Sequence, residues 1–155
     1  MSAEAKPLVG IILGSNSDRP ILDGCEELFE RFNVPFEIVV HSAHRDPDGV
    51  REWATTAEER GLKVIIAVAG KAAALGGVVA SFTALPVIGV PVKTSDLGGL
   101  DSLLSTVQMP TGVPIATVAI NGAKNAAILA TQILGTSMPE YREAIREYKS
   151  DLAKQ

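Results

Sequence analysis

The two histidines of this 155-residue chain, His41 and His44, lie in one short segment. Arg45 follows His44 directly, and the segment begins where the apolar run 36–40 ends. Histidine gains and loses a proton near neutral pH, whereas arginine keeps a positive charge that suits phosphate or carboxylate groups. We therefore take His44 as a candidate general acid/base. His41 is the weaker candidate, because neighbouring residues of a strand point to opposite faces.

A second polar loop, Gly14-Ser15-Asn16-Ser17-Asp18, follows the apolar run 8–13. Glycine lets a ligand approach the backbone closely, and serine hydroxyls together with the free N–H groups of a helix start suit a phosphate. The carboxylate of Asp18 can accept hydrogen bonds from sugar hydroxyls. A helix cap formed by Ser17 or Asp18 explains the same residues without any ligand.

A third loop, residues 69–77, follows the apolar run 64–68 and consists mainly of glycine and alanine. Such small side chains allow a ligand to lie against the backbone. The one charged residue of this loop, Lys71, stands near a predicted helix start, where the helix dipole disfavours a cation. That misfit favours a functional reason for Lys71, although a solvent-exposed lysine is the simpler interpretation.

Strand-like apolar runs alternate along the chain with segments of helical periodicity. The predicted strands are 8–13, 36–40, 64–68, 86–90 and 114–120, and the predicted helices are 18–32, 48–60, 72–83, 100–107, 123–134 and 139–154. This alternation predicts an α/β protein with a central parallel sheet and helices on both faces. Since ligands of such sheets bind beyond the carboxyl ends of the strands, the three loops are expected to converge on one edge.

Composition narrows the class of protein. The length and the 46% hydrophobic content fit one domain over residues 1–155, and a net charge of −4 without a long basic run argues against nucleic-acid binding. The single cysteine, Cys25, excludes an intrachain disulfide and a multi-cysteine metal site, and its helical spacing predicts buried packing. No apolar run has the length of a membrane span, and the N-terminus lacks the pattern of a signal peptide. We therefore expect a cytoplasmic protein.

Two helical segments suggest more than one subunit. The segment 123–134 is apolar nearly all round and needs cover on more than one side. The segment 139–154 has a narrow apolar stripe that can pack on a neighbouring subunit as easily as on its own domain. We expect a homo-oligomer on these grounds.

Several motifs together resemble the aminoimidazole ribonucleotide carboxylase / N5-carboxyaminoimidazole ribonucleotide mutase family of purine biosynthesis. They are Gly14-Ser15-Asn16-Ser17-Asp18, Ser42-Ala43-His44-Arg45-Asp46-Pro47, Pro86-Val87-Ile88-Gly89-Val90-Pro91-Val92, Leu100-Asp101-Ser102-Leu103 and Gln108-Met109-Pro110-Thr111-Gly112-Val113-Pro114. The resemblance implies a flavodoxin-like three-layer α/β/α sandwich. It also implies a homo-octamer with the C-terminal helix reaching across subunits, and no metal or organic cofactor.

The resemblance also implies roles for individual residues. Ser15 and Asp18 match phosphate- and ribose-binding positions, Arg45 matches a phosphate-contacting arginine, and His44 matches the general acid/base. The other residues expected to contact the ribonucleotide are Gly14, Ser17, Ser42, Gly70, Lys71, Ala72 and Leu75. The implied reaction moves a carboxylate from the exocyclic N5 to ring carbon C4 through transient CO2.

One loop departs from the family pattern of the mutases. Ala74 stands where the mutases have histidine, and Gly76 where they have proline. A basic residue matching Lys71 without that histidine is similar to the animal-type carboxylases, which use free CO2 directly. Direct carboxylation therefore stays open beside the mutase reaction, as does a nucleotide-binding homologue without turnover. For either enzyme we expect Lys71 to supply positive charge near the carboxylate or CO2.

Overall fold

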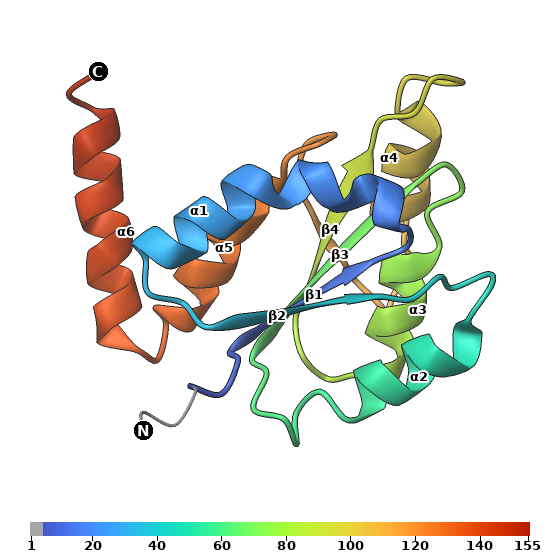
Figure 1. The fold of residues 1–155 in the computed structure, drawn as a ribbon, viewed down its shortest axis with the longest axis horizontal. Coiled ribbons are helices and arrows are strands. Elements are labelled where there is room, and N and C mark those ends of the chain that lie inside the picture. Colours follow the sequence, from blue (N-terminus) through green and yellow to red (C-terminus); the bar gives the residue numbers. More distant parts are fainter. Residues whose placement is uncertain (1–4) are drawn as a thin grey trace.

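Residues 5–155, the part of the chain that the computed structural model describes, form one sheet with helices on both faces (Figure 1). Residues 1–4 lie outside the described part of the chain. The expectation that the chain has no signal peptide rests partly on these residues. In chain order the elements are β1 (Val9–Leu13), the 3-10 helix η1 (Asn16–Leu22), α1 (Asp23–Arg31), β2 (Phe36–Val40), α2 (Pro47–Thr55), β3 (Val64–Gly70), α3 (Leu75–Phe82), β4 (Val87–Val92), α4 (Leu100–Val107), β5 (Ala116–Thr117), α5 (Ala123–Leu134) and α6 (Pro139–Leu152).

The five strands are all parallel and lie in the order β2-β1-β3-β4-β5. The chain therefore steps outward from β1 to β2, returns past β1 to β3, and continues to β4 and β5. This is the flavodoxin-like, doubly wound arrangement, and it confirms the predicted α/β class. The direction of winding reverses between β1 and β3, which is where such sheets leave a crevice for a ligand.

Successive side chains along each strand pack into two separate hydrophobic cores, one on each face of the sheet. Ile11 and Ile66 face the side covered by α1 and α5, whereas Ile12 and Ile65 face the side covered by α2 and α3. All of β1 is buried, as its continuous apolar run predicts for a central parallel strand. Cys25 is buried in the first core, and burial raises the pKa of its thiol to about 12, which confirms the predicted packing role.

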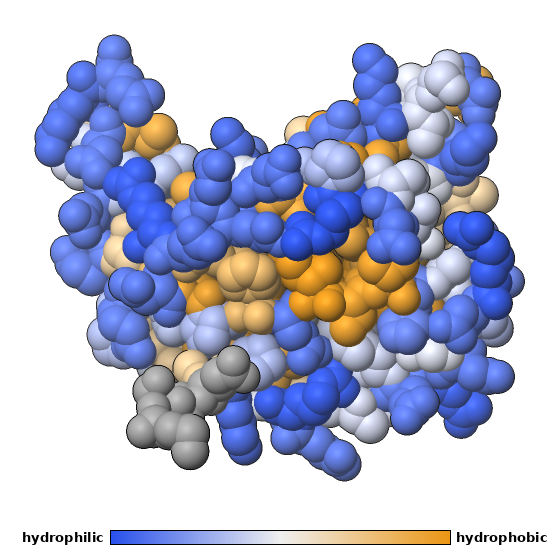
Figure 2. Space-filling model, in the orientation of Figure 1, coloured by the Kyte–Doolittle hydropathy of each residue, from blue (hydrophilic) through white to orange (hydrophobic). Residues whose placement is uncertain are grey.

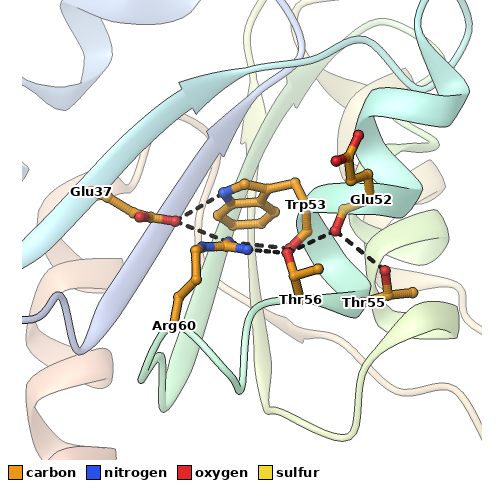
Figure 3. Close-up of polar contacts among 6 residues, drawn as sticks. All are labelled: Glu37, Glu52, Trp53, Thr55, Thr56 and Arg60. Atoms are coloured by element: carbon orange, nitrogen blue, oxygen red, sulfur yellow. Dashed lines mark hydrogen bonds and ion pairs between the residues drawn. The ribbon is translucent and has the colours of Figure 1, made fainter.

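A partly buried polar network fastens α2 to the edge strand β2 (Figure 3). The indole N–H of Trp53 donates to Glu37 Oε1 at 2.9 Å, and Arg60 Nη2 donates to the same oxygen at 3.0 Å. Arg60 also donates to the carbonyl oxygen of Trp53 at 3.1 Å and lies over its ring, 5.3 Å from the centroid. The network joins the end of α2 and the following turn to the sheet, so α2 cannot swing away from β2 without breaking several contacts.

Three predicted elements have different limits in the structure. The helix predicted for 18–32 begins as η1 and becomes α-helical only at Asp23, because Pro20 has no N–H to donate to an α-helical ladder. The helix predicted for 48–60 ends at Thr55, where the side chains of Thr55 and Thr56 bond back to carbonyls of the preceding turn. The strand predicted for 114–120 pairs only over Ala116–Thr117, at the sheet edge.

The structure removes one sequence-based reason for expecting an oligomer. Helix α5 is covered within the chain by the sheet, α1 and α6, so its apolar faces need no second subunit. Helix α6 also packs on its own chain, with Tyr141 and Ile145 buried and Tyr148 edge-on to Phe32. A contact of α6 with a neighbouring subunit stays a prediction.

The face drawn in Figure 2 is mainly polar, with hydrophobic surface gathered along the edge strand β2 beneath α1. Val40, the last residue of β2, is among the exposed large hydrophobic side chains. No helix within residues 5–155 has both the length and the apolar composition needed to cross a membrane.

We predict that Gly10→Ala lowers the free energy of unfolding by about 1–3 kcal/mol, because overpacking a filled core is costly. A Cβ at Gly10 would lie 2.7 Å from Trp53 Cζ2 and 2.6 Å from Leu62 Cδ1. Gly14→Ala is the matched control, since the nearest atom to its added Cβ is 3.7 Å away. Urea unfolding of both variants is the measurement, and equal stability of the two would contradict this packing argument.

Candidate active site

The carboxyl ends of three neighbouring strands lie at one level. Leu13, the last residue of β1, pairs with Val40 of β2 and with Val68 of β3. The chain therefore leaves β1 and β2 at matched positions, and β3 continues by two further residues along β4. The loops that follow these strands emerge beside one another, as predicted.

A cavity of about 590 Å³ opens at this edge of the sheet. Its lining consists of Gly14, Ser15, Ser17, Asp18, Ser42, Ala43, His44, Arg45, Ala69, Gly70, Lys71, Ala72, Ala73, Ala74, Leu75 and Thr94. Every residue expected from the sequence to contact a substrate lies in this lining. The volume is within the usual range for small-molecule sites.

The first loop of the lining is organised around Ser15. Its hydroxyl accepts a hydrogen bond from the backbone N–H of Ser17 at 3.2 Å and lies 2.9 Å from the Ser17 hydroxyl. The cap of η1 is therefore Ser15, and the alternative that Ser17 or Asp18 forms the cap is wrong. Burial raises the pKa of Asp18, which lies beside the cavity without being the cap.

The second loop presents His44 and Arg45, both exposed at the cavity. The Ser42 hydroxyl accepts from the backbone N–H of Arg45 at 3.2 Å, and the N–H of Asp46 donates to the carbonyl oxygen of Ser42 at 2.8 Å. The loop is thus a tight turn, and its conformation directs two consecutive side chains of different chemistry to one cavity.

Helix α2 begins immediately after this turn. Asp46 Oδ1 accepts from the backbone N–H of Gly49 at 3.1 Å, so Asp46 is the cap of α2, with Pro47 in the first helical turn. His41 Nδ1 lies 2.6 Å from the other carboxylate oxygen of Asp46. The hydrogen bond with His41 holds the pKa of Asp46 below its usual value. His41 is not part of the cavity lining, which agrees with the expectation that it is the weaker of the two acid/base candidates.

The third loop contains an unusual backbone conformation at Lys71. Its φ of +54° lies in the left-handed region that a non-glycine residue rarely adopts. Lys71 Nζ lies 2.6 Å from Asp96 Oδ2, which raises the pKa of the lysine and ties the loop after β3 to the loop after β4. Lys71 therefore lines the cavity while its charge is shared with a carboxylate.

Sequence reasoning missed Thr94, which lines the cavity two residues after the end of β4. A Cβ on Gly70 would lie 3.1 Å from Thr94 Cγ2, so the loops after β3 and β4 are in close contact here. The sequence does contain a signal for Thr94, because it follows the fourth predicted strand and ligands bind beyond the carboxyl ends of such strands.

The fold and the site define a doubly wound α/β protein with a small-molecule site at the carboxyl edge of its sheet. The sequence profile of the family described as AIR carboxylase, where AIR is aminoimidazole ribonucleotide, matches residues 8–155. The chain belongs to this family.

Relatives with similar sequences include two named as mutases, of which the chain covers more than four fifths, and a much longer yeast protein. The chain is 58% identical over 147 residues to N5-carboxyaminoimidazole ribonucleotide mutase from Pyrococcus horikoshii, covering 95% of this chain and 83% of that protein. It is 59% identical over 149 residues to the protein of the same name from Thermotoga maritima, covering 96% and 87%. A phosphoribosylaminoimidazole carboxylase from Saccharomyces cerevisiae is 52% identical over 148 residues, which are 96% of this chain and 26% of the yeast protein.

Solved structures show the same fold. A crystal structure of Treponema denticola PurE has a TM-score of 0.86 at 29% sequence identity, covering 96% of this chain and 92% of that chain. A structure of a PurE2 variant from the same organism has a TM-score of 0.88 at 28% identity, covering 97% and 93%.

Proposed function

We propose that this protein converts N5-carboxyaminoimidazole ribonucleotide to 4-carboxyaminoimidazole ribonucleotide in purine biosynthesis, in the cytoplasm. One observation carries the proposal: a single cavity unites an acid/base histidine, an arginine and a hydroxyl-rich loop in a chain whose full-length relatives bear the mutase name. The cavity volume of about 590 Å³ suits a ribonucleotide.

The polar side of the cavity holds the phosphoribosyl group in this proposal. Arg45 contacts the phosphate through its permanent charge, and Ser15 and Ser17 contribute hydroxyls at the start of η1. Asp18 accepts hydrogen bonds from the ribose, and the hydroxyl of Ser42 holds the backbone of Arg45 in place. Gly14 leaves room beside these groups, because no protein atom comes within 3.7 Å of the position of a Cβ there.

The reaction proceeds in two halves with one histidine. In the first, the bond between N5 and the carboxylate carbon breaks, its electron pair stays on nitrogen, and protonated His44 gives that nitrogen a proton. CO2 and aminoimidazole ribonucleotide result. In the second, the enamine carbon C4 attacks CO2, and neutral His44 removes the C4 proton. The histidine ends as it began, so the conversion needs no net proton.

The apolar side of the cavity retains the CO2. Gly70, Ala72 and Leu75 belong to the cavity lining together with neighbouring alanines, and in this proposal they lie against the gas molecule without offering it a polar side chain. Holding CO2 beside its acceptor replaces a bimolecular encounter by a local one, which lowers the entropic part of the barrier.

We predict that the wild-type protein turns over N5-carboxyaminoimidazole ribonucleotide rapidly without bicarbonate. His44→Asn should lower kcat by at least about 100-fold, because a general acid/base contributes about 100- to 10,000-fold to a rate. Affinity for aminoimidazole ribonucleotide should change little in that variant, because phosphate binding does not need the base. Product formation followed by absorbance and ligand affinity by calorimetry are the measurements.

Three outcomes of this assay have distinct meanings. Turnover of aminoimidazole ribonucleotide with bicarbonate, and not of the carboxylated substrate, would establish the direct carboxylase instead. Binding with no turnover of either substrate would establish a nucleotide-binding homologue. An unchanged rate in His44→Asn would remove His44 from the mechanism.

Direct carboxylation is the second candidate because of the loop after β3. Ala74 puts a methyl group where the mutase pattern has an imidazole, and Lys71 adds an ammonium group to the cavity edge. We propose that Lys71 attracts the transferred carboxylate, in competition with Asp96, whose Oδ2 lies 2.6 Å from Lys71 Nζ.

We predict that Lys71→Ala lowers kcat/KM several-fold, about as much as losing one partly screened charge contact. Alanine keeps a Cβ at the φ of +54°, so the backbone strain of the wild type is retained and only the charge is removed. Asp96→Asn is the companion variant and should lower KM for the carboxylate-bearing substrate, since it frees Lys71. An unchanged kcat/KM with both substrates in Lys71→Ala would contradict the role of Lys71.

We also propose that the protein is a homo-oligomer, with an octamer as the expected state. The support now comes from α4 and the turn before it, where Leu97, Leu100, Leu104 and Val107 are between 45% and 64% exposed. Three of these recur at helical spacing and form an unpartnered apolar stripe, which a second copy of the chain would cover.

We predict a solution mass of about eight chains by light scattering at micromolar concentration, consistent with the closed symmetry of most homo-oligomers. Leu100→Lys together with Leu104→Lys should reduce that mass, because the charges would be buried in the interface. A monomeric wild-type protein would overturn the assembly proposal.

A further inference from the structure

We propose that His41, acting through Asp46, is a positioning residue that holds the catalytic turn, residues 42–45, in its active conformation. The inference rests on the function proposed above, because the catalytic turn carries His44 and Arg45. Neither His41 nor Asp46 lines the cavity, so their effect on the reaction must pass through the turn between them.

The hydrogen bond between these two side chains closes the turn at its base. The backbone N–H of His41, the residue after β2, donates to the carbonyl oxygen of Leu13 at 3.0 Å, so the backbone of His41 is held at the end of β1. Asp46 belongs to α2 as its cap. The distance of 2.6 Å from His41 Nδ1 to Asp46 Oδ2 therefore joins the fixed end of a strand to the fixed start of a helix.

The carboxylate of Asp46 uses its two oxygens for two separate tasks. Oδ1 accepts from the N–H of Gly49 at 3.1 Å, which is the whole of the helix-capping contact. Oδ2 accepts from His41, which capping does not require. A serine at this position would cap the helix about as well and leave His41 without a partner.

Gly49 supplies an independent sign that the pair is built into the structure. A Cβ on Gly49 would lie 2.3 Å from Asp46 Oδ2 and 2.6 Å from His41 Nδ1. The His41–Asp46 hydrogen bond thus occupies the place of a side chain in the first turn of α2. Glycine inside a helix lowers stability by about 0.5–1 kcal/mol relative to alanine. At position 49 the missing side chain leaves room for the His41–Asp46 pair.

The rest of α2 cannot take over this positioning role. The contacts of Trp53 and Arg60 with Glu37 hold the C-terminal end of α2 (Figure 3). The catalytic turn precedes the N-terminal end of the helix, so these contacts do not reach it. With both strand and helix fixed, the catalytic turn has few ways to relax. The Ser42 hydroxyl bonds to the Arg45 N–H within the turn, and the His41–Asp46 bond joins the two residues that flank it.

The expected effect is a loss of rate greater than the loss of stability. Exposed ion pairs contribute little to folding, whereas a misplacement of catalytic groups by about 1 Å costs up to about 100-fold in rate. We expect His41→Ala and Asp46→Ser each to lower kcat/KM by about 10-fold, and the double variant to lower it no further, since both remove the same contact.

Two other variants separate positioning from simple packing. In His41→Asn the side-chain amide nitrogen sits where Nδ1 sits and can donate to Asp46, so most of the rate should return. Gly49→Ala would displace the pair, so its rate should fall, while its better helix propensity offsets part of the stability lost by moving the Asp46 cap.

The deciding measurement is the NMR spectrum of the two imidazole rings in the ligand-free protein, taken together with kcat/KM. The chain has two histidines, so one variant assigns both signals. We expect Asp46→Ser to move the signals of His44 as well as those of His41, although Asp46 does not line the cavity that holds His44.

Unchanged His44 signals with unchanged kcat/KM in His41→Ala and Asp46→Ser would overturn the proposal and leave the pair a structural contact. Since the spectrum needs no turnover, a wild-type protein inactive on both substrates would refute the proposed function while the His44 signals still decide the positioning role.

Discussion

The parallel register of β1 with its two neighbours is the constraint on which the site depends. Leu13 pairs with the last residue of β2 and with Val68 of β3, so polar loops begin at one level although they are far apart in sequence. Burial on both faces fixes that register, because a slip by one residue would exchange the side chains of the two cores. The cavity therefore follows from the sheet, and the loops supply only its chemistry.

The second requirement is a fixed direction for α2, because the turn before it carries His44, the acid/base of the proposed reaction. Gly10 of β1 lets the Trp53 ring lie directly on the sheet, and the indole N–H reaches Glu37 on β2. Arg60 adds a charge to the same carboxylate and stacks on the same ring. A helix held in this way presents its N-terminus at a defined point of the sheet edge, which is what a catalytic turn of few residues needs.

The sequence predicts the sheet, its helices and the residues that line the cavity. These depend on the periodicity of apolar residues and on where the strands end, and both are local properties of the sequence. It fails where one residue changes local geometry, as at Pro20, which turns the start of a helix into η1. It also fails for contacts between loops. Lys71 and Asp96 are 25 residues apart, and their bond depends on a positive φ at Lys71 that composition does not reveal.

The two polar side-chain contacts next to the cavity, His41–Asp46 and Lys71–Asp96, are both at least partly exposed. Pairs with this exposure contribute little to the free energy of unfolding, so the fold does not depend on them. Each nevertheless joins segments whose relative position shapes the cavity: strand end to helix start in one case, the loop after β3 to the loop after β4 in the other. The scaffold and the chemistry are thus separable in this chain. The buried strands decide where a ligand can bind, and in the proposed mechanism two exposed side-chain contacts set how the reacting groups meet it.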